Sequence, residues 1–185
     1  MQHPFERIPP TRRKRTFVLL FALTLVVMIV MNMTGVPLQT DAAPQGIVSF
    51  EFAGNASKAQ EILDSWDAEA QAHAGFNLGF DFVFLLAYST TIAFACAWLA
   101  SALRGWRQNL ATVGLWLAWG QSLAALLDVV ENAALTTMLL GSVKSPWPQV
   151  AWLCALPKFV LVFLGLAYVV LGVILQRIVR PDRFS

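Results

Sequence analysis

The sequence predicts an all-α integral membrane protein, a four-transmembrane-helix up-down bundle with an outer amphipathic helix between helices one and two. Hydrophobic residues make up 57% of the 185-residue chain and charged residues only 13%, about half of the ~25% usual in globular domains. Four apolar segments each reach the ~20 residues that a helix needs to cross a bilayer. No internal repeat is evident, which argues against the inverted-repeat architecture of many transporters.

The first apolar segment, residues 16–34, follows a basic tail at residues 1–15 that we assign to the cytoplasm. A cleavable signal peptide is the alternative, with Asp41-Ala42-Ala43 as a poor cleavage site. The segment is long for the apolar part of a signal peptide. We therefore expect it to be retained as the first transmembrane helix.

Residues 36–73 form the one long polar connection and should lie outside the membrane. Asn55 or Ser57 could cap a helix that runs to about Ala72. Its apolar residues recur at three- and four-residue spacing, and they are Ala59, Ile62, Leu63 and Trp66. Acidic and other polar residues fill the remaining positions. This pattern predicts an amphipathic helix that covers the bundle or rests among the lipid head groups.

The other transmembrane helices are expected at residues 74–103, 109–140 and 149–179, followed by a short cytoplasmic tail at 180–185. The turn at 104–107 is basic, and the turn at 141–148 is rich in proline. Short connections place successive helices side by side and antiparallel. Residues 16–179 should therefore form a single transmembrane bundle.

The basic residues gather on one side of this topology. Ten Lys and Arg residues lie in the N-terminal tail, the 104–107 turn and the C-terminal region, whereas the outer connections hold only Lys58 and Lys144. The positive-inside rule then places both termini in the cytoplasm, in a multi-pass protein of the cell membrane, here taken as an inner membrane. We read the N-terminal basic run as this topology signal in preference to a nucleic-acid site.

Four ionisable residues interrupt the apolar helices, and they are Asp81, Asp128, Glu131 and Lys158. A charge at mid-membrane costs ~2.5–3.5 kcal/mol on insertion scales, so such residues usually face the bundle interior. Each lies about two to three turns from the outer end of its helix, which puts all four at one depth. With neighbours on the same helix faces, they predict a ligand- or ion-binding cluster of Asp81, Tyr88, Asp128, Glu131, Asn132 and Lys158.

Three acids and one base leave this cluster with a formal charge of −2 when all are ionised. Such an excess should not persist in a medium of low dielectric constant. Two outcomes stay open at this point. Either a carboxyl group remains protonated, or a cation or the cationic group of a ligand completes the site.

The favoured hypothesis is an integral membrane protein that binds a small molecule, a lipid or a cation at the cluster in the outer half of the bundle, and that could serve in a transporter. The alternative is a structural or assembly subunit of a membrane complex, in which the charges form an ion-pair network. The third is an intramembrane lipid-modifying enzyme. The expected partners are membrane lipids, the ligand and, in the second case, another membrane protein, with no nucleic acid.

No cofactor is evident from the sequence, and an enzyme is less expected than a binding protein. His3 and His73 are the two histidines, and neither lies deep in a predicted helix. Haem held between histidines, zinc catalysis and a serine–histidine nucleophile therefore lack their side chains.

Several short stretches resemble motifs of uncharacterised bacterial four-helix integral membrane proteins. They are Phe50-Glu51-Phe52-Ala53, Ile62-Leu63-Asp64-Ser65-Trp66, Asp81-Phe82-Val83-Phe84 with Tyr88, and Asp128-Val129-Val130-Glu131-Asn132. The resemblance covers most of residues 47–135 and implies a fold without a known activity. It also draws attention to Glu51 and Trp66, which we expect to lie outside the membrane as a lid over the cluster.

Overall fold

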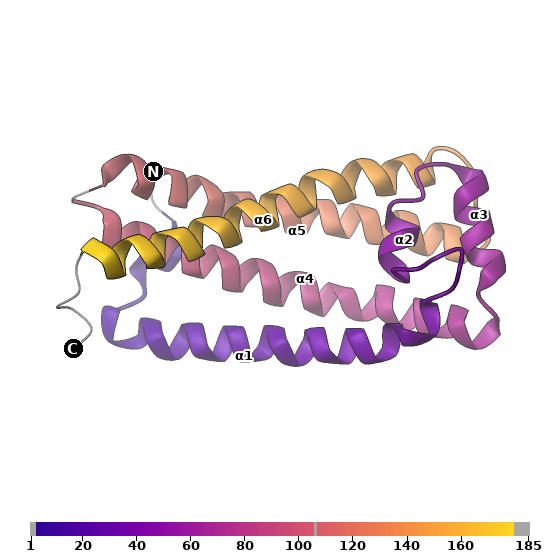
Figure 1. Ribbon diagram of the computed structural model, residues 1–185, viewed down its shortest axis with the longest axis horizontal. Helices are drawn as coiled ribbons and strands as arrows, with labels where there is room; N and C mark the ends of the chain where they lie inside the picture. Colours follow the sequence, from indigo (N-terminus) through magenta and orange to yellow (C-terminus); the bar gives the residue numbers. More distant parts are fainter. Residues whose placement is uncertain (1–2, 106, 180–185) are drawn as a thin grey trace.

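A computed structural model describes residues 3–105 and 107–179, and four long helices dominate it (Figure 1). They are α1 (Pro10–Gly35), α4 (Ala68–Leu103), α5 (Gln108–Leu139) and α6 (Trp147–Val179). All four are long and apolar enough to cross a membrane. The predicted all-α bundle is thus confirmed, and the chain has the architecture of a multi-pass membrane protein. The predicted tail at 180–185 lies outside the described residues.

Four short elements complete the described chain. A 3₁₀ helix, η1 (Pro4–Arg7), precedes α1, and a second one, η2 (Val36–Leu38), follows it. The short helices α2 (Ile47–Glu51) and α3 (Ala56–Ser65) lie at the end of the bundle where α5 turns into α6 (Figure 1). We call α2, α3 and their connecting loops the cap.

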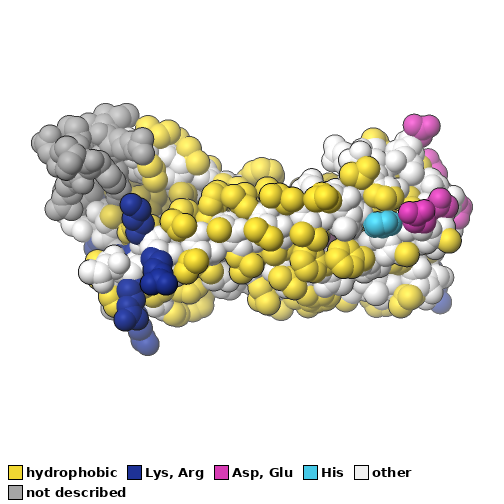
Figure 2. Space-filling model, turned by 90° about the horizontal axis from the view of Figure 1, so that it is seen from below, with side chains coloured by type: hydrophobic (Ala, Val, Ile, Leu, Met, Phe, Trp, Pro, Cys, Tyr) yellow, Lys and Arg dark blue, Asp and Glu magenta, His cyan; other side chains and the backbone are white. Residues whose placement is uncertain are grey.

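The two ends of the bundle carry opposite charge. Figure 2 shows Lys and Arg side chains at one end, Asp and Glu side chains at the other, and a mostly apolar surface between them. The basic end holds the start of α1 and the α4–α5 turn, and the acidic end holds the cap. This separation matches the charge pattern of the sequence.

The N-terminal segment is more ordered than a simple tail. Helix α1 begins at Pro10 and not at Thr16, because proline suits the first turn of a helix. The Arg13 side chain donates to the carbonyl groups of Ile8 and Glu6 at 2.9 and 3.0 Å. The ring of His3, 5% exposed, packs against that of Trp119 on α5. Residues 3–9 therefore fold back onto the basic end of the bundle.

The amphipathic helix of the cap is shorter than the sequence suggests. It starts where expected, because the Asn55 side chain accepts from the backbone N–H of Lys58 at 2.9 Å. It ends at Ser65, whereas an end near Ala72 was predicted. Asp67 explains the difference, since its carboxylate accepts from the N–H of Ala70 and caps a new helix, α4. The apolar face of α3 packs on the bundle, where Ile62 is fully buried.

The long helices do not pack equally. Helices α4, α5 and α6 pack against one another, and α1 packs mainly on α4. Glycines allow the close contacts, because a Cβ atom on Gly114 would collide with Tyr168 and one on Gly165 would collide with Ile92 and Gln121. Within the fully described α1, Val27 alone is buried. The fold is thus a tight three-helix core with α1 attached along one edge.

Candidate functional site

Lys158 is the centre of the predicted cluster. Its Nζ lies 2.9 Å from Oδ1 of Asp128 and 2.9 Å from Oε1 of Glu131. Lys158 is 6% exposed and Glu131 is fully buried. Asp128 lies about 16 Å below the end of α5, and Lys158 lies about 16 Å beyond the start of α6. The predicted equal depth of these groups brings them into direct contact.

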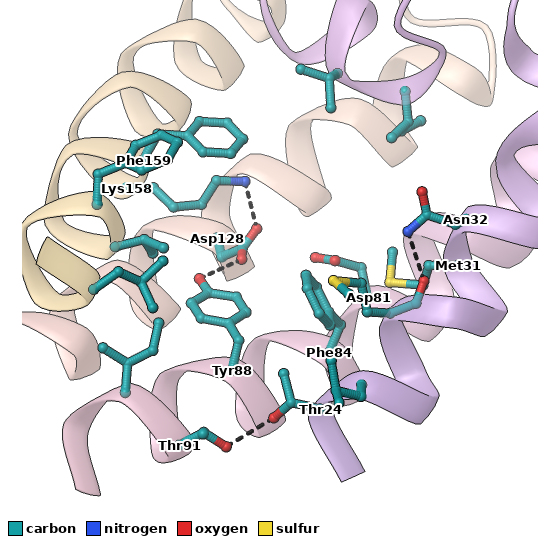
Figure 3. Close-up of a pocket in the computed structure, with 18 of the residues that line it drawn as sticks. Thr24, Met31, Asn32, Asp81, Phe84, Tyr88, Thr91, Asp128, Lys158 and Phe159 are labelled. Atoms are coloured by element: carbon teal, nitrogen blue, oxygen red, sulfur yellow. Dashed lines mark hydrogen bonds and ion pairs between the residues drawn. The ribbon is translucent and has the colours of Figure 1, made fainter. Parts of the chain in front are cut away.

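Tyr88 joins the cluster from α4. Its hydroxyl donates to Oδ2 of Asp128 at 2.8 Å, so both oxygens of that carboxylate have a partner (Figure 3). The helices α4, α5 and α6 are thereby joined at one level by Tyr88, Asp128 and Lys158. Transfer of a carboxylate from water to the interior is unfavourable. The hydrogen bonds from the phenol and the ammonium group offset that cost.

Asp81 of α4 and Asn132 of α5 form a hydrogen-bonded pair beside the cluster around Lys158. The amide of Asn132 donates to Oδ2 of Asp81. Asp81 is partly exposed and makes no ion pair with Lys158. In Figure 3 its carboxyl group lies in the space between Asn32 of α1 and Asp128 of α5. No described residue donates to Oδ1 of Asp81.

The two expected lid residues lie in different places. Glu51, the last residue of α2, reaches the cluster with Oε2 at 3.7 Å from Nζ of Lys158. Trp66 is 2% exposed, donates its indole N–H to the carbonyl of Leu38 at 2.9 Å and packs on Phe50. Trp66 therefore supports the cap from within, and only Glu51 contacts the site.

A cavity of about 700 Å³ opens beside the cluster, between α1 and α6. Glu51, Asp81, Tyr88, Asp128 and Lys158 border it near the acidic end. The rest of its wall is mainly apolar and extends towards the basic end. The apolar lining comes from Phe17, Phe21, Leu25, Met28, Phe84, Ile92, Val162, Phe163, Leu166 and Val169. Glu131 and Asn132 lie behind this wall, within the helix core.

The cavity opens on the side of the bundle, on the apolar surface that would face lipid in a membrane. Phe163 is 65% exposed, and Phe21, Met28 and Leu166 are also exposed, although all four border the cavity. The space is therefore a lateral groove. We call it the α1–α6 groove.

The contribution of α1 was missed from the sequence. Thr24 and Thr91 share a hydrogen bond of 2.8 Å that holds α1 against α4 at the wall of the groove (Figure 3). Asn77 donates to Thr34 at 3.0 Å near the acidic end. The only available signal was a few polar residues, Thr24 and Asn32 among them, within an otherwise apolar segment. Such residues in a membrane helix usually face another helix.

The carboxyl group of Glu51 brings a titratable charge from the cap to the site. Burial raises the pKa of the Glu51 carboxyl above its ordinary value, and the nearby ammonium of Lys158 opposes that rise. Oε2 of Glu51 and Oε2 of Glu131 are both buried and accept no hydrogen bond. The site therefore has more carboxylate oxygens than donors.

Two results bear on the nature of the site. Within residues 3–105 and 107–179, no group of three or more His, Cys, Asp and Glu residues is arranged to hold a metal ion. Comparisons of the chain with family models, with curated proteins and with solved structures found no match. The resemblance of residues 47–135 to bacterial four-helix membrane proteins thus stays a prediction.

Proposed function

We propose that this membrane protein binds an amphipathic small molecule, such as a single-chain lipid, in the α1–α6 groove. The polar group of the ligand would lie at the cluster and its apolar chain would lie along the groove. The observation that supports this most directly is a cavity of about 700 Å³ whose apolar wall ends at a group of buried charges. Ligand sites typically measure ~300–1,000 Å³ and combine an apolar wall with a few polar groups.

The dimensions of the groove suit a chain. On α1 its lining includes Asn32, near the cluster, and Phe17, near the basic end. Fifteen residues of helix correspond to roughly 22 Å, a large part of the ~30 Å hydrocarbon core of a bilayer. The sideways opening lets a ligand enter directly from the membrane, so the chain need not pass through water.

The charged groups divide between two roles in this proposal. Asp128 and Glu131 both form ion pairs with Lys158 and hold α5 to α6, as the structural hypothesis expects. Asp81 and Glu51 are less completely paired and border the groove, which suits contact with a ligand. A purely structural ion-pair network would not account for the cavity beside these charged groups.

The test measures binding in nanodiscs of zwitterionic lipid. Three probes share one hexadecyl chain that carries a photoreactive diazirine at its end, and their head groups are an amine, an alcohol or a carboxylate. We expect saturable labelling, with at least one of the three, of peptides that contain α1 or α6 groove residues. Leu166→Trp should reduce that labelling at least tenfold, because the indole fills a groove position.

Leu171→Trp is the matched control. Leu171 lies on the same helix and is 60% exposed, but it does not border the groove. This variant should label as the unmodified protein does. Labelling that stays unsaturated with all three probes, or that falls equally in both variants, would refute binding in the groove.

A further inference from the structure

We propose that the ligand of the α1–α6 groove is a cationic amphiphile, an amine or ammonium head group on a long apolar chain. This inference rests on the proposed function and specifies its head group. The structural feature behind it is the balance of charges at the acidic end of the groove.

The cluster contains more acid than the sequence alone indicated. Glu51 joins Asp128 and Glu131 around the ammonium of Lys158, and Asp81 borders the groove beside them, so the layer holds four carboxyl groups and one ammonium group. Full ionisation would leave a formal charge of −3 in a layer walled by apolar helices. A positive head group compensates such an excess, whereas an anionic head group would increase it.

Two carboxyl groups that border the groove, those of Glu51 and Asp81, have an oxygen without a hydrogen bond, and so does Glu131 behind its wall. Oε2 of Glu51 and Oε2 of the fully buried Glu131 accept no hydrogen bond. Oδ1 of Asp81 receives no donor from the described residues and lies at the groove. Buried acceptors without a donor, such as the two glutamate oxygens, are rare in folded proteins, and an unmade hydrogen bond is unfavourable. An ammonium group brings up to three donors and no acceptor, which matches the site.

The donors beside the carboxylates are already engaged, and the side-chain amides of Gln39 and Gln45 border the groove only at its exposed rim. Lys158 donates to two carboxylates at 2.9 Å, Tyr88 donates to Asp128, and Thr24 bonds to Thr91. Asn32 and Asn77 donate to Met28 and Thr34. A carboxylate or phosphate head group needs free donors or a free cation. Among the described lining residues, Lys158 is the one cation, and it is already paired.

Figure 3 shows the position that remains for the head group. Asp81 faces the open space from one side, and Asp128 with Lys158 closes the other. Glu51 borders the same space from the cap. An ammonium group there would contact Asp81 and Glu51, and its chain would extend along Leu25, Val162 and Leu166.

The experiment compares the three hexadecyl probes by competition in the same nanodiscs at neutral pH. Hexadecylamine should bind at least tenfold more tightly than hexadecanol or palmitate, because hydrogen bonds to charged groups are worth more than neutral ones. Asp81→Asn keeps an oxygen that can accept from Asn132 but removes the charge. It should lower the affinity for hexadecylamine at least tenfold and leave that for hexadecanol within about twofold.

Asp64→Asn is the control, since it removes one acidic charge from the exposed face of α3, at the same end of the molecule. It should leave the preference for the amine unchanged. Should Asp81→Asn fail to fold, Glu51→Gln tests the same point from the cap.

The outcomes distinguish a wrong head group from a wrong proposed function. Saturable, Leu166→Trp-sensitive binding of all three probes with equal affinity would overturn the cationic head group and leave the proposed function standing. A preference for palmitate, or an amine preference that persists fully in both acid variants, would overturn it as well. Absence of groove labelling with every probe would refute the proposed function itself.

Discussion

At the scale of single residues, Lys158 is the group on which the interior depends most. It is the partner of two buried carboxylates, and Glu131 is fully buried. Breaking a buried ion pair by removing one member leaves an uncompensated charge, which typically costs about 3–5 kcal/mol. We therefore expect Lys158→Met to lower the free energy of unfolding in mixed micelles by about that amount.

Two further variants test the explanation. Lys144→Met removes an exposed lysine from the α5–α6 turn and should change stability by less than about 0.5 kcal/mol. Combining Lys158→Met with Asp128→Asn and Glu131→Gln should recover part of the loss, because the two carboxylates closest to the missing ammonium are then neutral. Unaltered stability in Lys158→Met would mean that the lysine is not paired as described.

At the scale of the secondary-structure elements, α2 links the cap to the site through Glu51. The raised pKa of this carboxyl means that it loses its proton at a higher pH than a glutamate in water. The protonated form is neutral and attracts a cation less. Affinity for hexadecylamine should therefore be weaker at low pH and should rise as the pH passes through the pKa of Glu51. The amine itself stays protonated well above neutral pH, as lysine does.

Glu51→Gln should remove this step from the pH profile. The charged groups that face Glu51 are Lys158 of α6, Asp128 and Glu131 of α5, and Asp81 of α4. Any pH dependence that remains in the variant belongs to them. A profile identical to that of the unmodified protein would show that Glu51 does not titrate in contact with the ligand.

The elements also show what local patterns in the sequence can and cannot predict. The buried positions of α3 followed from their helical spacing, and Asn55 acts as the expected cap. The end of α3 could not be predicted from the spacing, because Asp67 looks like an ordinary polar surface residue in the sequence but caps α4 in the structure. Whether an aspartate caps a helix or continues one depends on the backbone at its own position, and composition does not reveal that.

At the scale of the whole molecule, the common depth of the charged residues was predictable and their surroundings were not. The cost of charge in lipid requires Asp128, Glu131 and Lys158 to face inward, so their convergence follows from their positions along the helices. The groove could not be predicted in this way. Apart from Thr24 and Asn32, the cavity-facing positions of α1 are as apolar as the lipid-facing ones, and residues such as Leu19 and Leu25 look alike in the sequence.

The orientation in the membrane is a prediction at this scale as well. We propose that the basic end faces the cytoplasm, because positive residues beside membrane helices are retained there. In a background with both native cysteines replaced by alanine, Asp64→Cys should react with a membrane-impermeant maleimide in intact cells. Arg12→Cys should react only after lysis. Both positions are exposed, so the opposite pattern would reverse the orientation.

The sideways opening of the groove has a consequence for how affinity must be expressed. A molecule that arrives through the gap beside Phe21 and Phe163 comes from the surrounding sheet of lipid, where it is already concentrated. Occupancy then follows the number of ligand molecules per lipid molecule, and the amount dissolved per litre matters little. Doubling the quantity of empty bilayer in a sample would halve the occupancy at low saturation, although the protein and its contacts are unchanged.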